Sequence, residues 1–259
     1  MDKLRRYEFI NKAYPFCAIV FLWYLLHIIV DSPAIPSPFD AFKNFITILP
    51  GTLLIHIGMS FVRIVAAILI SLVAGSIIGV LIGMNKKADI LLSPIIYVLY
   101  PLPKIAFMPI LMILFGIGEK PKILLIIFII IFQFILAARD GIKDIPKEIF
   151  LSVYSLGLGR LHVYRHLVIP GIMSKVITAT RNTIGISISV LFFSENFATS
   201  YGIGYFIMNS WSMVNYVEMF SGIIALGLMG LLLFKAIDII EKYLCPWTRL
   251  KNNFIENHQ

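Results

Sequence analysis

Long apolar runs separated by short polar segments dominate this sequence and restrict the folds open to it. The runs recur from Pro15 to Ile240 without a polar block long enough to fold separately. In lipid, a helix satisfies its own backbone hydrogen bonds and needs roughly 20 mostly apolar residues to span. Charged residues make up only 14% of the chain, against roughly 25% in soluble domains. The sequence therefore predicts one all-α integral membrane domain.

We expect about six transmembrane helices, within a domain at residues 15–240 that lies between an N-terminal segment, 1–14, and a C-terminal tail, 241–259. The basic start resembles a secretory signal, but no small-residue cleavage site follows, so we interpret the first run as a retained span. The expected spans are Pro15 to Val30, Val62 to Met84, Ile90 to Phe115, Ile123 to Ala138, Leu167 to Phe192 and Tyr216 to Ile237.

The basic residues between the spans predict the orientation of the chain. With the N terminus inside, the outer segments hold only Lys43, Lys120 and Lys122, and the positive-inside rule favours this arrangement. Both termini are then cytoplasmic, and the protein is a multi-pass protein of the cell (inner) membrane. The inner segments hold Lys3, Arg5, Arg6, Lys12, Lys86, Lys87, Arg139, Lys143, Lys147, Arg160, Arg165, Lys242, Arg249 and Lys251.

Composition argues against several other functions. The formal charge of +8 comes from scattered basic groups instead of one stripe, so nucleic acid is not an expected partner. Cys17 and Cys245 cannot form a disulfide framework or a CxxC metal site. His162 and His166 have the spacing of a metal pair, but no acidic or cysteine ligand accompanies them, so we expect no metal site.

Two patterns inside the spans indicate close packing or a cavity. Gly75, Gly79 and Gly83 share one face of the second span and predict close helix contact. Pro101 and Pro103 interrupt the third span beside Lys104. Such a break survives where protein or a watery cavity covers it, and a kink needed only for packing is the alternative.

Polar residues near or within the spans are candidates for a translocation path. Arg181 lies eleven residues after Pro170, roughly 16 Å along the fifth span. Intramembrane charges face a cavity or a partner, so Arg181 and its neighbour Asn182 either line a path or serve a structural ion pair. Arg63 is expected to snorkel to the interface. The full candidate set is Lys104, Arg181, Asn182, Glu195 and Asn196.

The longest inner connection, at about residues 139–166, is too polar to span the membrane and reads as two short helices. Asp144 and Pro146 predict an N-cap and a first-turn proline for a helix ending near Leu156, and Gly157 and Gly159 end it. A second helix, about Arg160 to Leu167, leads into the fifth span. From periodicity alone, an amphipathic helix lying on lipid is the first interpretation.

This connection resembles the EAA loop of type I ABC importer permeases, in which a glycine lies thirteen residues before a proline, as Gly157 and Pro170 do. The sequence is similar to that of the nitrate, sulfonate and taurine type of permease over nearly the whole chain. The matching segments are PSP at Pro36 to Pro38, HIGMSFVRI at His56 to Ile64, FGIGEKPKI at Phe115 to Ile123, SLGLGR, ATRNTIG around Arg181, SEN at Ser194 to Asn196, YGIG at Tyr201 to Gly204 and CPW at Cys245 to Trp247.

The resemblance implies a permease subunit of an ATP-driven importer of a small, anionic or zwitterionic solute such as a sulfonate, taurine or nitrate. It implies three protein partners: an ABC ATPase, an extracytoplasmic solute-binding protein facing Glu195 and the segment Ser200 to Trp211, and a second permease copy. The family's acidic residue is absent, because Leu151, Ser152 and Val153 occupy the Glu, Ala and Ala positions. The implied ATPase contacts, in this coupling loop, are Glu148, Leu151, Ser152, Val153, Ser155, Gly157, Arg160 and Pro170.

Two other classes of function stay open on the residues alone. An ATP-independent secondary transporter or channel would also use a broken helix and a buried arginine. An intramembrane enzyme is disfavoured, because neither an HExxH nor a GxSxG motif occurs. No GxxxxGK[ST] phosphate loop occurs either, so we expect no cofactor in this chain and ATP bound by the partner subunit.

Overall fold

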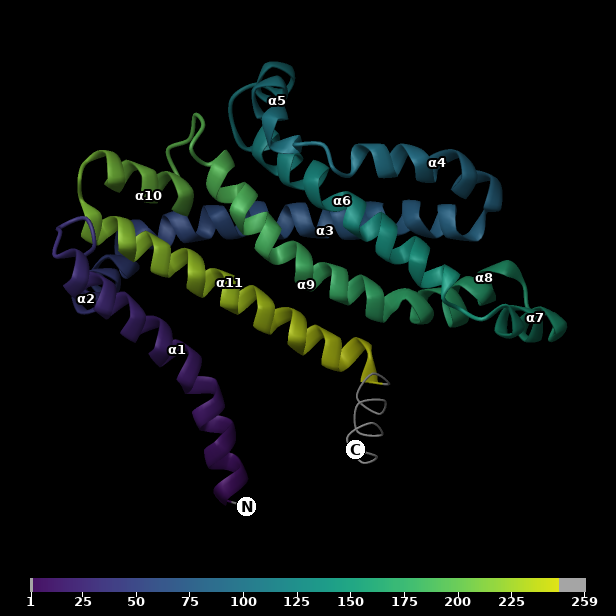
Figure 1. Ribbon diagram of the computed structural model, residues 1–259. Coiled ribbons are helices and arrows are strands. Elements are labelled where there is room, and N and C mark those ends of the chain that lie inside the picture. The colour runs from purple at the N-terminus through teal and green to yellow at the C-terminus, as the bar shows by residue number, and fades with distance from the viewer. Residues whose placement is uncertain (1, 247–259) are drawn as a thin grey trace. The chain divides into compact units, whose positions relative to one another are not determined.

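The computed structural model describes the backbone of residues 2–246 and the side chains of residues 14–246. In this part of the chain every regular element is a helix, which confirms the predicted all-α class (Figure 1). The helices are α1 (Asp2–Val30), α2 (Pro38–Ile48), α3 (Leu54–Met84), α4 (Lys86–Leu99), α5 (Met108–Phe115), α6 (Glu119–Lys143), α7 (Lys147–Ser155), α8 (Arg160–Val163), α9 (Ile169–Ser194), α10 (Ile203–Ser212) and α11 (Tyr216–Leu244).

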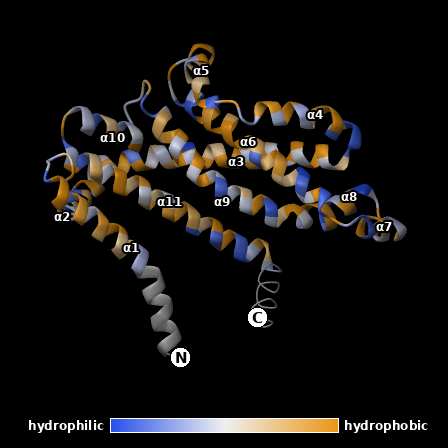
Figure 2. Ribbon diagram, in the orientation of Figure 1, coloured by the Kyte–Doolittle hydropathy of each residue, from blue (hydrophilic) through white to orange (hydrophobic). Residues whose placement is uncertain are grey.

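The predicted number of six spans is not matched in full. Among the described residues, four helical stretches are long and apolar enough to cross a membrane, and they contain α3, α6, α9 and α11. The bent pair α4 and α5 makes a fifth if it counts as one span. The first expected span is a shorter apolar helix, Tyr14–Val30. Figure 2 shows α3, α6 and α11 coloured mainly hydrophobic and α9 coloured in a mixture, with hydrophilic residues also near α7 and α8.

The described chain divides into two compact units. One contains residues 2–59 and 200–227, and the other contains residues 60–199 and 228–246. In the first unit, Trp23 of α1 stacks on Phe220 of α11 with ring centroids 5.1 Å apart. Asn44 of α2 donates a hydrogen bond of 3.0 Å to Ser221 Oγ. The short helices α2 and α10 belong to this unit and have no counterpart among the expected spans.

The second unit holds the glycine face predicted from the sequence. A Cβ added at Gly75 would lie 2.7 Å from Phe134 Cβ, and one added at Gly79 would lie 2.8 Å from Ala138 Cβ. Only glycine therefore permits this approach of α3 to α6, and the predicted close contact is confirmed. The side chains of Ile64, Leu125 and Ile130 are fully buried in this unit.

The third expected span is broken where the prolines predicted a break. α4 ends at Leu99, α5 begins at Met108, and the axes of Lys86–Leu99 and Lys104–Phe115 differ by 85°. Proline cannot donate the backbone hydrogen bond that a continuous helix requires, so Pro101 and Pro103 prevent one here. Gly116 has a φ of +79°, a conformation that suits glycine, and it ends α5 before the chain turns into α6.

Helices α8 and α9 form one continuous stretch, Arg160–Ser194, of 35 residues. A π-helical turn over Tyr164–Val168 joins them without a break. The helix predicted at about Arg160 to Leu167 is thus the first part of the fifth span. The first part of this continuous stretch, residues 160–168, buries Val163 and Val168, whereas α7 buries none of its side chains.

Replacing Gly79 with alanine is expected to destabilise the protein. Alanine in a helix interior ordinarily stabilises by about 0.5–1 kcal/mol relative to glycine, but here overpacking against α6 costs about 1–3 kcal/mol. The Gly185→Ala variant is the matched control, because no heavy atom lies within 4 Å of its added Cβ. Thermal unfolding in detergent should show a lower Tm for Gly79→Ala and an unchanged or higher Tm for Gly185→Ala. A rise in both would contradict the close contact.

Candidate functional site

Helix α7 is an isolated short helix with an exposed apolar surface. Leu151 is 66% exposed and Leu156 is 75% exposed, and Tyr154 is also exposed. Glu148 lies in its first turn and is exposed, as are Ser152 and Ser155. Nine residues form a marginal helix by themselves, and apolar side chains left in water are unfavourable. This surface has the properties of a contact site for another molecule.

The end of α7 is fixed by backbone geometry. Gly157 has a φ of +71°, and its N–H donates a hydrogen bond of 3.0 Å to the carbonyl oxygen of Tyr154. A glycine in the left-handed region just past a helix satisfies the last carbonyl groups. Gly159, with a φ of −66°, then precedes α8. The sequence prediction that these glycines end the helix is confirmed.

The predicted N-cap of α7 is wrong. Pro146 itself occupies the N-cap position, with a φ of −56° and a ψ of 138°, and makes no side-chain capping bond. Asp144 is instead the C-cap of α6, and its carboxylate forms an ion pair with Lys175 of α9. A carboxylate held by this long-range partner is not available for the first turn of α7.

A buried cluster of charges joins α3, α6 and α9. Arg63, 1% exposed, donates from Nη1 to Glu195 Oε1 at 2.6 Å and from Nη2 to Glu119 Oε1 at 2.7 Å. Its Nε also binds Glu119. Glu195 is fully buried and accepts a further bond of 2.7 Å from Ser60 Oγ. The expectation that Arg63 snorkels to the interface is wrong, because its charge is balanced within the protein.

The candidate path residues on α9 and its end therefore have different environments. Arg181 donates from Nη2 to Asp238 Oδ1 and Glu241 Oε2 of α11, both at 2.6 Å, so of its two expected roles it has the structural ion pair. Glu195 is buried in the Arg63 cluster. Asn196, the next residue, is exposed in the loop that follows α9. Asn182 is exposed and borders a cavity.

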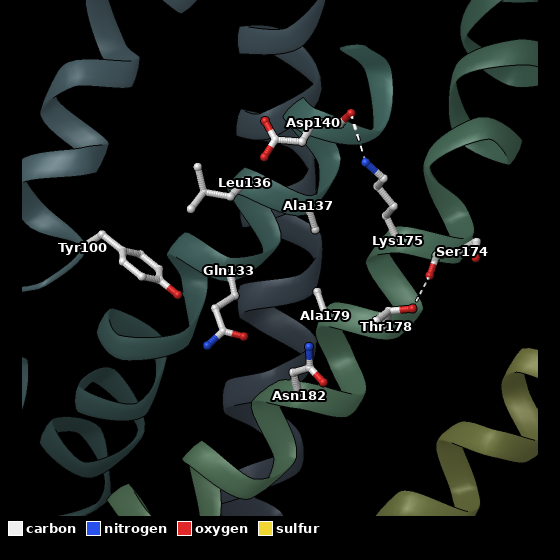
Figure 3. Close-up of a pocket in the computed structure, with 10 residues that line it drawn as sticks. All are labelled: Tyr100, Gln133, Leu136, Ala137, Asp140, Ser174, Lys175, Thr178, Ala179 and Asn182. Atoms are coloured by element: carbon white, nitrogen blue, oxygen red, sulfur yellow. Dashed lines mark hydrogen bonds between the residues drawn. The ribbon is translucent and has the colours of Figure 1, made fainter. Parts of the chain in front are cut away.

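That cavity, of about 500 Å³, is lined by residues of α6 and α9 and by Tyr100 at the end of α4; most are polar, and Leu136, Ala137 and Ala179 are apolar. Figure 3 shows Gln133 and Asn182 on facing helices, with Lys175 reaching toward the backbone oxygen of Asp140. Amide, hydroxyl and ammonium groups in this lining offer many hydrogen-bond donors, and Asp140 adds one carboxylate, which accepts hydrogen bonds. The cavity is therefore suited to a small polar molecule.

Lys104 borders a second cavity, of about 310 Å³, that shares Tyr100 and Gln133 with the first. The lysine is buried, donates from Nζ to the carbonyl oxygen of Tyr100 at 2.7 Å, and lies 4.7 Å from the ring centroid of Phe132. The structure thus brings Lys104 and Asn182 to neighbouring cavities. Gln133 was missed, although it is an isolated polar residue in the run Ile123 to Ala138 and could have been noticed.

The arrangement of helices is similar to that of a known transporter. A solved structure of the MetNI methionine ABC transporter in an inward-facing conformation aligns with a TM-score of 0.64 at 16% sequence identity. The alignment covers 74% of this chain and 96% of the other. The fold is that of a type I importer permease. Among the described residues, four helical stretches, or five with the bent pair, are long and apolar enough to span a membrane.

The sequence identifies the family. The profile of the binding-protein-dependent transport system inner membrane components matches residues 71–250, more than half of the chain. The chain belongs to this family of ABC transporter permeases. It is a multi-pass inner-membrane transport subunit without enzymatic activity, and the ATPase of such a system is a separate subunit.

Several curated proteins are similar over most of the chain. The taurine transport system permease protein TauC of Escherichia coli is 27% identical, with 82% of this chain and 80% of TauC aligned. The putative aliphatic sulfonates transport permease protein SsuC of Bacillus subtilis is 26% identical, over 85% of this chain and 80% of SsuC. The nitrate import permease protein NrtB of Leptolyngbya laminosa is 28% identical, over 74% of this chain and 68% of NrtB.

Removing the buried carboxylate should destabilise the protein far more than removing an exposed one. Glu195→Gln removes the fully buried one of the two carboxylates that bind Arg63 and leaves only the partly exposed Glu119, which costs about 3 kcal/mol. Asp238→Asn weakens a pair in which the carboxylate is 53% exposed, and its expected cost is below about 1 kcal/mol. The free energy of unfolding, measured in mixed micelles, should separate the two variants. Equal losses of the free energy of unfolding in the two variants would contradict a larger contribution of the Arg63 cluster to stability.

Proposed function

We propose that this chain is the membrane subunit of an ATP-driven, binding-protein-dependent importer of a small anionic or zwitterionic solute. Relatives named for taurine, aliphatic sulfonate and nitrate transport support this class of solute. The family name itself includes the binding protein. In this proposal ATP binds the separate ATPase subunit, and the permease holds no cofactor.

The loop around α7 is the proposed contact with the ATPase, and its exposed apolar surface is the observation that carries the proposal. Burying a leucine is worth about 1.5–3 kcal/mol, so Leu151 and Leu156 together provide substantial docking energy. Arg160 begins the long helix that contains α9, and Pro170 lies within it. A displacement of α7 therefore reaches α9 through only the short segment Leu156–Gly159. The proposed contact residues are Glu148, Leu151, Ser152, Val153, Ser155, Gly157, Arg160 and Pro170.

The proposed cycle needs a second copy of the chain and an external partner. Two copies pair around the pathway, and the solute-binding protein delivers solute at the segment Ser200 to Trp211. ATP binding favours the outward-facing packing of the helices, and hydrolysis restores the inward-facing one. The excess of basic residues in the α7 loop and near both ends of the chain supports cytoplasmic termini.

The two neighbouring polar cavities are the proposed part of the path within one subunit. Lys104 supplies a positive charge, while Gln133 and Asn182 supply uncharged donors. A small anion can exchange its hydration shell for such groups without binding too tightly to leave. Arg181, Glu195 and Asn196 are not assigned to this wall, because the first two are engaged in ion pairs and Asn196 is an exposed loop residue.

Gly157→Val is expected to uncouple the transporter. A left-handed conformation costs an ordinary residue about 1–2 kcal/mol, which lowers the population of the docking conformation roughly tenfold. Solute uptake and solute-stimulated ATP hydrolysis in proteoliposomes should both fall by about that factor. Gly159→Ala is the matched control, because its φ of −66° suits alanine and no atom lies within 4 Å of the added Cβ. Full uptake by Gly157→Val would argue for an ATP-independent transporter.

A cysteine at position 155 should report the orientation of the α7 loop. Ser155 is exposed, so Ser155→Cys, in a chain with Cys17 and Cys245 replaced by serine, offers one accessible thiol. A membrane-impermeant maleimide should label inside-out vesicles and leave intact cells unlabelled. Labelling of intact cells would reverse the proposed topology.

A further inference from the structure

Two cavities of opposite character adjoin each other at one end of α3. The first, of about 370 Å³, lies between α3 and α9, and the second, of about 540 Å³, lies where α3 meets α4, α7 and α8. Both are lined by Leu81 and Tyr164, so they are neighbours, and we call the two together the recess. All of the lining residues belong to the same compact unit.

The first cavity is an apolar groove. Its walls include Val73, Ile77 and Val80 of α3 and Ile169 and Met173 near the start of α9. These residues belong to stretches that are long and apolar enough to cross a membrane. A groove of this kind accepts a hydrocarbon chain, which neither gains nor requires hydrogen bonds there.

The second cavity is polar and basic. Lys86 and Arg160 line it together with Asn85, Tyr154 and Tyr164, and none of its described lining residues is acidic. Lys86 and Arg160 are exposed, so their charges remain accessible to a ligand. The first turn of α4 also lies here and adds the partial positive charge of a helix N-terminus. The site therefore favours an anion with several acceptor oxygens.

We propose that the recess binds an anionic phospholipid, with an acyl chain in the groove and the phosphate between Lys86 and Arg160. The position fits a lipid, because the apolar helix α3 ends at Met84 and the basic pocket begins beside it. In a phospholipid at a membrane interface, the acyl chain lies in the apolar region and the phosphate lies beside it at the surface, as the groove and the basic pocket do here. Basic pockets between membrane helices are a known means of binding acidic headgroups.

The bound lipid would connect the corner between α3 and α4 with α7 and α8. Tyr154 comes from α7 and Arg160 from the start of α8, and both line the headgroup pocket. The lipid therefore limits the movement of the loop around α7 relative to the membrane helices. This site is independent of the solute that the protein carries, but it shares Arg160 with the proposed ATPase contact.

Native mass spectrometry of the detergent-purified full chain tests the proposal. The chain is mixed with equal amounts of phosphatidylglycerol and phosphatidylcholine of the same acyl composition. We expect preferential retention of phosphatidylglycerol. Each cation contributes roughly fivefold to the binding of an acidic lipid, so Lys86→Gln with Arg160→Gln should remove most of that preference.

The matched charge control is Lys43→Gln with Lys120→Gln, which removes two exposed cations that do not line the recess. It should keep the preference. Val80→Trp fills the groove and should weaken retention of phosphatidylglycerol, whereas Ile70→Trp, at an exposed position of α3 outside the groove, should not. Elution as one species with an unchanged Tm shows that each variant is folded.

Three results would overturn the proposal. One is an equal retention of the two lipids by the unmodified chain. Another is the same loss in the Lys43 and Lys120 control as in the Lys86 and Arg160 variant. The third is loss of the preference when the ATPase subunit is bound, which would assign the basic pocket to that protein.

Discussion

The absence of water in a bilayer governs every level of this structure. Backbone groups must find partners within the chain, so the membrane-crossing elements are helices. The same condition applies to charged side chains: Arg63 is balanced by Glu119 and Glu195, and Arg181 by Asp238 and Glu241. Where prolines break the span at α4 and α5, the side chain of Lys104 binds a backbone carbonyl oxygen. The charged side chains named here are thus either paired with an opposite charge or bound to a backbone oxygen beside a cavity.

Features that depend on local sequence were predictable, and features that depend on distant partners were not. Apolar runs located the stretches around α3, α6, α9 and α11, and glycine spacing located the close face of α3. The expected start of the second span, Val62, was too late. α3 begins at Leu54, and it can include Arg63 because Glu119 and Glu195, both distant in sequence, pair with its charge. The Asp144 cap failed for a related reason, since Lys175 lies 31 residues away. Helices α2 and α10 were missed because neither is long enough to span.

Continuity between helices links the exposed loop to the interior of its unit. The stretch Arg160–Ser194 begins beside α7, carries Arg181 at its middle and ends one residue before Glu195. Two positions thus tie the same helix to its neighbours by charge, one to α11 and one to α3 and α6. A force applied at α7 reaches a helix that is stiff and anchored, which is the mechanical requirement for coupling ATP hydrolysis to a change of packing in the membrane. The recess at Lys86 and Arg160 lies at the same junction.

Photo-crosslinking from position 151 probes the coupling contact without changing the fold. Leu151 projects from an exposed helix, so a photoreactive phenylalanine analogue there should leave packing unaltered. In native membranes containing the whole system, we expect a covalent adduct with an ABC ATPase subunit, identified by mass spectrometry. The same analogue at Ile113, an exposed position of α5, should yield none. Adducts at position 151 with lipid alone would contradict the proposal that α7 binds an ATPase.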